Sequence, residues 1–176
     1  MKQTEKSTKR MVFAALCLAL AYVLPFLTGQ IPQIGKMLCP MHIPVLLCGF
    51  LCGWPWGLAV GFIAPLLRSL TLGMPILFPG AVCMAFELAT YGAVSGILYR
   101  ILPRKRVFLY VSLLSAMLLG RVVWGISMLI CLVGIKGGQF GFAAFISGAI
   151  TGSIPGILIQ LILVPLVVEV VVRRTK

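Results

Sequence analysis

A chain of 176 residues that is 61% hydrophobic and only 10% charged, with a mean hydropathy of +1.13, differs sharply from soluble domains, in which roughly 25% of residues are charged. The composition predicts an integral membrane protein, and it excludes a soluble domain of any size because no polar stretch is long enough to fold alone. The net charge of +12 does not indicate nucleic-acid binding, because the basic residues form no stripe with interleaved aromatic residues.

Six apolar segments, in chain order, are expected to cross the membrane as helices. The first follows a basic tail, as in a signal peptide, but no A-x-A cleavage motif follows it, so we expect a retained helix. The second and third are short and are separated only by Trp54-Pro55-Trp56. The fifth and sixth are long enough to tilt or to project beyond the bilayer. We therefore predict an all-α fold, a single membrane domain over residues 1–176, with transmembrane helices at about 11–28, 38–54, 56–72, 80–102, 107–135 and 141–172.

The basic residues predict the orientation of this bundle. Eleven of the fifteen fall in three clusters, namely Lys2, Lys6, Lys9 and Arg10; Arg100, Arg104, Lys105 and Arg106; and Arg173, Arg174 and Lys176. An even number of spans puts all three clusters on one side, and the positive-inside rule makes that side the cytoplasm. Both termini are therefore expected to be cytoplasmic. The outer loops, residues 29–37, 73–79 and 136–140, carry only Lys36 and Lys136.

Residue types that support catalysis or metal binding are scarce. Five of the six cysteines lie within apolar runs and none forms a C-x-x-C pair, which is typical of small packing residues rather than metal ligands. A serine nucleophile would have only His42 as a histidine base, and the chain has no aspartate. No Gly-rich loop is followed by Lys and Ser/Thr. We expect no enzyme activity, no metal or other cofactor and no ATPase within this chain, so uphill transport would need an ion gradient or a partner.

Small residues recur at every fourth position in several segments, a spacing that lets helix backbones approach closely in lipid. We expect them to pack helices rather than to bind ligands. They are Gly49, Gly53, Gly57 and Gly61; Gly92 and Gly96; and Ala144, Gly148, Gly152 and Gly156.

Two charged residues lie deep within apolar segments. Glu87 is seven residues into the fourth segment, or about 10 Å deep at the helical rise per residue, and Arg121 is at the middle of the fifth. A charge at this depth costs at least about 2.5 kcal/mol, so it is rarely kept without a partner or a function. The pair predicts either a polar ligand pocket or an ion pair that only holds two helices together.

A pocket open to the outside is the functional hypothesis. The expected topology brings further polar side chains into the outer half of the bundle, namely His42, Arg68, Ser147 and Thr151. Tyr91 and Trp124, one helical turn from Glu87 and Arg121, add the aromatic surface typical of small-molecule pockets. His42 is equally consistent with an interfacial residue, and Arg68 with a side chain that extends to the outer surface. Gln160 is expected to lie too far inward to join the pocket.

Two local stretches point to a family. After the first outer loop the chain reads Met37-Leu-Cys-Pro-Met-His-Ile-Pro-Val-Leu-Leu47, and the first helix contains Ala15-Leu-Cys-Leu-Ala19, an A-x-x-x-A pattern. Together with the length, the six expected helices and the basic ends, they make essentially the whole chain resemble the substrate-binding (S) component of an energy-coupling factor (ECF) vitamin transporter.

The resemblance implies a mechanism. An S component in a bacterial plasma membrane captures a vitamin or related micronutrient from outside, associates with a transmembrane coupling subunit and two ATP-binding subunits, and topples to carry its site to the cytoplasm. Ala15 and Ala19 would face the coupling subunit. The family's sites use the first outer loop and helices four to six, which here correspond to Gln30–Cys39, Glu87, Tyr91, Arg121, Trp124, Ser147 and Thr151.

Three kinds of ligand remain open. Arg121 suits a carboxylate or phosphate, and Glu87 suits a hydroxyl, an amine or a ring N–H. Pantothenate would place its carboxylate on Arg121 and its hydroxyls on Glu87. A pyridoxine-like ring would stack on Trp124 or Tyr91 and hydrogen-bond Glu87, and a queuine-type precursor is the third option.

Two other classes of protein also remain open. One is a free-standing ion-coupled carrier with Glu87 as the proton site, although the inverted repeats common in such carriers are not visible. The other is a scaffold subunit that binds no ligand, in which Glu87 and Arg121 would be purely structural.

Overall fold

The computed structural model describes residues 2–28, 37–103, 105–135 and 153–174. These residues contain helices and no strand, which confirms the predicted all-α class. The elements in chain order are α1 (Lys2–Val23), η1 (Leu24–Thr28), α3 (His42–Cys52), α4 (Trp54–Leu72), η2 (Leu77–Ala81), α5 (Val82–Ile101), α6 (Arg106–Leu129), η3 (Ile130–Ile135) and α8 (Ile154–Arg174).

Five stretches of the described chain are helical and apolar over a length that can cross a membrane: Ser7–Phe26, Trp54–Leu72, Leu77–Ile101, Arg106–Ile135 and Ile154–Val172. Helix α3 is too short to cross a membrane, because its 11 residues extend about 16 Å and a hydrocarbon core is about 30 Å thick. The predicted second segment, 38–54, is longer than this helix because the backbone turns at both ends. Cys39 has a φ of +47° before the helix, and Gly53 has a φ of +98° after it. The count of six complete spans stays a prediction.

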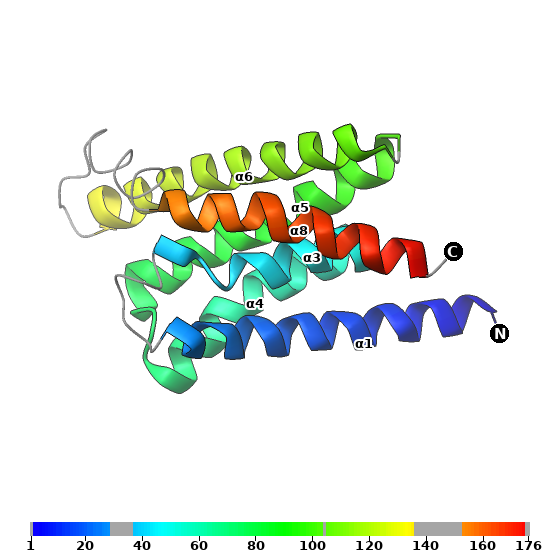
Figure 1. Ribbon diagram of the computed structural model, residues 1–176. Coiled ribbons are helices and arrows are strands. Elements are labelled where there is room, and N and C mark those ends of the chain that lie inside the picture. Colours follow the sequence, from blue (N-terminus) through cyan, green and yellow to red (C-terminus); the bar gives the residue numbers. More distant parts are fainter. Residues whose placement is uncertain (1, 29–36, 104, 136–152, 175–176) are drawn as a thin grey trace.

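Both chain ends and the turn between α5 and α6 lie at the same end of the bundle (Figure 1). The described members of the three basic sequence clusters belong to these segments. The cytoplasmic orientation of this end stays a prediction. The predicted sixth segment, 141–172, begins outside the described residues, and its described part is α8.

Glycines bring α3, α4 and α5 into backbone contact. A Cβ added to Gly92 of α5 would overlap the backbone of Gly57 in α4, and one added to Gly49 of α3 would lie 2.5 Å from the carbonyl oxygen of Gly92. The predicted packing role of these small residues therefore holds at this junction, where no side chain fits between the helices. Ala144, Gly148 and Gly152 lie outside the described residues.

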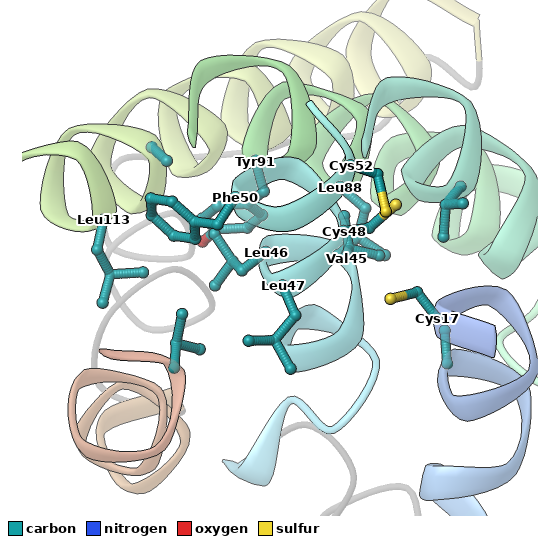
Figure 2. Close-up of a cluster of buried hydrophobic side chains, with 14 of the residues drawn as sticks. Cys17, Val45, Leu46, Leu47, Cys48, Phe50, Cys52, Leu88, Tyr91 and Leu113 are labelled. Carbon is teal, nitrogen blue, oxygen red and sulfur yellow. The ribbon is translucent and has the colours of Figure 1, made fainter. Parts of the chain in front are cut away.

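The apolar core surrounds α3. Figure 2 shows the side chains of this helix between Leu113 of α6 on one side and Cys17 of α1 on the other. The thiol of Cys17 contacts that of Cys48, which also contacts Cys52. All six cysteines are buried and free of disulfide bonds, in keeping with the packing role expected for most of them.

Candidate binding site

Arg121 of α6 and Glu87 of α5 form a buried ion pair. Arg121 Nη1 lies 2.9 Å from Glu87 Oε1, and the two side chains are 13% and 2% exposed. Gly120 makes this close approach possible, because a Cβ there would lie 3.2 Å from the carbonyl oxygen of Glu87 and 3.3 Å from the ring of Tyr91. Each charge thus has the partner that a membrane interior requires.

A residue of a third helix contacts the carboxylate of Glu87. His42, the buried first residue of α3, places Nε2 3.4 Å from Glu87 Oε1. Its ring stands edge-on to that of Tyr91, with the centroids 5.1 Å apart, and the buried Tyr91 interacts with Glu87 in turn. Residues from α3, α5 and α6, far apart in the sequence, therefore meet at one point.

Cys39 completes this group. Arg121 Nη2 donates to Cys39 Sγ at 3.6 Å, and the carbonyl oxygen of Cys39 accepts a hydrogen bond of 3.1 Å from the backbone N–H of His42. The positive φ of Cys39 is unfavourable for a residue with a Cβ, and strain of this kind gathers at functional sites. Cys39, His42, Glu87, Tyr91 and Arg121 are called the Glu87 cluster below.

The Glu87 cluster holds hydrogen-bonding capacity that the described residues do not use. His42 Nδ1 and Arg121 Nε are both buried, and neither has a hydrogen-bond partner among the described residues. Leaving a buried polar atom unpaired costs about 1–3 kcal/mol, so such atoms call for an explanation. A bound polar molecule would supply the missing partners.

Sequence reasoning reached Cys39 only through the resemblance and did not single out its neighbour Ser153. Ser153 is buried just before α8, where its hydroxyl interacts with the Cys39 thiol. Its apolar neighbours in the sequence gave no signal for this contact. Trp124 is half-buried one turn beyond Arg121 on α6. Residues 30–36 of the predicted loop site, Ser147 and Thr151 lie outside the described residues, and their place in a site stays a prediction.

Arg68 makes its described contacts elsewhere. It is 4% exposed, its Nη1 donates to the backbone carbonyl of Tyr22 at 2.7 Å, and its guanidinium carbon lies 5.0 Å from the centre of the Phe26 ring. Tyr22 in turn donates its hydroxyl to Thr71 Oγ1 at 3.1 Å. Arg68 thus ties the end of α1 and η1 to α4, and its contacts among the described residues include none with the Glu87 cluster.

An experiment can distinguish a structural role of Arg68 from a role in ligand binding. Arg68→Met should lower the free energy of unfolding by about 1.5–3 kcal/mol, the usual contribution of a hydrogen bond to a charged group, and leave ligand affinity unchanged. Thermal unfolding in detergent and calorimetric titration with a pooled vitamin mixture would measure the two effects. A variant of normal stability that binds more weakly would instead place Arg68 in the pocket.

Two faces of α1 differ in their surroundings. Ala14, Cys17 and Ala21 are buried against the bundle. Ala15 and Ala19 lie one turn apart on the exposed face. The exposed side therefore presents two small side chains, one turn apart, among larger exposed ones such as Val12 and Leu16.

Comparison with known proteins adds one finding. A family model described as "ECF transporter, substrate-specific component" matches residues 9–168, which is most of the chain. No curated protein and no solved structure matches it.

Proposed function

The chain belongs to the substrate-specific components of ECF transporters, and we propose that its Glu87 cluster binds a small water-soluble vitamin or vitamin precursor taken from outside the cell. Membership of the family makes the protein a multi-pass membrane protein, the substrate-capture subunit of an importer rather than an enzyme, and a partner of coupling and ATP-hydrolysing subunits. The carrier and scaffold alternatives lose their support.

The geometry of Arg121 carries the proposal. A guanidinium binds carboxylates best along an edge with two parallel N–H groups. Glu87 occupies Nη1, whereas Nε has no partner among the described residues and Nη2 meets only the weak sulfur acceptor of Cys39. The edge formed by Nε and Nη2 can therefore receive a ligand carboxylate while Nη1 stays paired with Glu87.

A carboxylate-bearing ligand of the pantothenate type suits this edge best. His42 Nδ1, which also lacks a partner among the described residues, offers a second contact for a hydroxyl group. A pyridoxine-like ligand has no carboxylate for Arg121 and would depend on ring stacking. Tyr91 is already packed edge-on against His42, so stacking would have to involve Trp124.

The docking partner and the orientation belong to the same proposal. The exposed Ala15 and Ala19 would contact the coupling subunit, because small residues allow a second helix to approach closely. The end of the bundle that carries both termini and the basic clusters would face the cytoplasm (Figure 1).

Mass spectrometry of small molecules released from gently purified protein tests the proposal. The wild-type protein should release a vitamin-like compound, or retain one from a pooled vitamin mixture, and Glu87→Ala/Arg121→Ala should release none. A wild-type protein that retains nothing from the pool, or a double variant that retains as much as the wild type, would refute this assignment of the site.

A further inference from the structure

Gln160, in the N-terminal half of α8, is buried without the contacts that an amide requires. The residue is 1% exposed, and neither its Nε2 nor its Oε1 has a hydrogen-bond partner among the described residues. Five buried polar atoms share this condition in the described part of the chain. Two belong to Gln160, one each to His42 and Arg121, and one to Ser69.

The face of α8 that carries Gln160 is the face that meets the Glu87 cluster. Ser153, which precedes α8, contacts Cys39, and a Cβ on Gly156 would lie 2.7 Å from the carbonyl oxygens of Met37 and Leu38. Gln160 follows Gly156 by four residues and Ser153 by seven, so helical periodicity places all three on one face. This face looks toward α3 and α6, the helices against which α8 packs.

Distance along the helix sets the position of Gln160 relative to Arg121. Arg121 and Ser153 both contact Cys39, so they mark the same level of the bundle. Seven residues of helix correspond to about 10 Å, which places the amide roughly two turns inward from the guanidinium. A structural amide between helices would be bonded to its neighbours, and this one is not bonded within the described residues.

We propose that Gln160 is a specificity-determining residue of the same site, whose amide binds a second polar group of the ligand at its inner end. The inference rests on the proposed function and narrows it. The ligand is elongated, with a carboxylate at Arg121 and, about two helical turns away, a group that both donates and accepts hydrogen bonds. An amide or a pair of hydroxyls has this property, and it matches the donors and acceptor of a glutamine side chain.

A site whose buried polar groups need hydrogen-bond partners discriminates strongly against a ligand that cannot supply them. The two probes are therefore pantothenate, which carries an amide and hydroxyls beyond its carboxylate, and heptanoate, a carboxylate with an apolar tail. The wild-type protein should prefer pantothenate by at least about a hundredfold.

Gln160→Met keeps the volume of the side chain and removes its donors and acceptor. Calorimetric titration should show pantothenate affinity falling by about tenfold or more and heptanoate affinity changing by less than about twofold. Because the variant no longer buries an unpaired amide, the Tm of the ligand-free protein should rise by roughly 2–4 °C. Leu161→Met is the matched control on α8 and should alter neither affinity.

The opposite results overturn the inference. A lower Tm, or a variant that does not fold, would show that the amide is bonded within the empty protein and is structural. Unchanged pantothenate affinity would remove Gln160 from the site. Binding of a compact vitamin from the pool but not of pantothenate would refute the elongated ligand and leave the Glu87 cluster as the binding site, whereas failure to bind any vitamin in the pool would refute the proposed vitamin site itself.

Discussion

Replacing Glu87 or Arg121 alone should destabilise the protein more than replacing both. Glu87→Gln leaves the buried guanidinium of Arg121 without a counter-charge, and Arg121→Met leaves the buried carboxylate of Glu87 without one. Each single variant should lose about 3–5 kcal/mol of stability. Glu87→Gln/Arg121→Met removes both charges and should recover most of that stability, since a buried ion pair is often neutral relative to uncharged residues of similar volume. Thermal unfolding of the four ligand-free proteins in detergent would measure this non-additivity.

Ligand binding should not recover in the double variant, although its stability should. Each of the three variants should bind pantothenate at least about thirtyfold more weakly than the wild-type protein, because a ligand carboxylate loses either Arg121 or the acid that orients it. A stable double variant that still binds normally would show that the pair only joins α5 to α6. Arg106→Met/Glu169→Gln is the control, since that ion pair of 2.9 Å is 69% and 30% exposed and should alter stability by about 1 kcal/mol or less and binding not at all.

The variant Ala15→Leu/Ala19→Leu should still bind the ligand but should no longer support normal transport. Neither residue contacts the Glu87 cluster, and both lie on the exposed face of α1, so the variant should fold and bind pantothenate as the wild type does. Two added isobutyl groups would keep a helix of the coupling subunit from close contact. Uptake by cells that contain the complete transporter should therefore fall by at least about tenfold, and the variant should no longer co-purify with the coupling subunit.

A matched control fixes the meaning of that result. Leu114→Phe/Leu118→Phe places two enlarged side chains at the same four-residue spacing on an exposed face of α6, where the native leucines are 51% and 69% exposed. This variant should transport normally. Equal loss of uptake in both variants would assign the effect to general disturbance of the bundle in lipid and would contradict docking through Ala15 and Ala19.

The sequence by itself determined the class of protein, the helical segments and the charges within them. Helices in lipid satisfy their own backbone hydrogen bonds, so a long apolar run predicts a helix without reference to the rest of the chain. The cost of burying a charge is equally local, and it marked Glu87 and Arg121 before any fold was known. Where the backbone departs from a simple helix, the same reasoning was less exact. The segment predicted at 38–54 contains the shorter α3, because the turns at Cys39 and Gly53 depend on φ angles that hydropathy does not reveal.

Only the tertiary structure decided which side chains meet. Hydropathy assigns a depth to each residue but no direction around the helix axis, and that direction follows from contacts between distant segments, such as the backbone approach of Gly57 to Gly92. Those contacts join His42 to Glu87 across 45 residues of sequence and Arg68 to Tyr22 across 46. They also bury Gln160 without a hydrogen-bond partner among the described residues. Its expected depth had excluded this residue from the predicted pocket. The composition of each helix thus determines that it forms, and close packing between helices determines where its polar side chains lie.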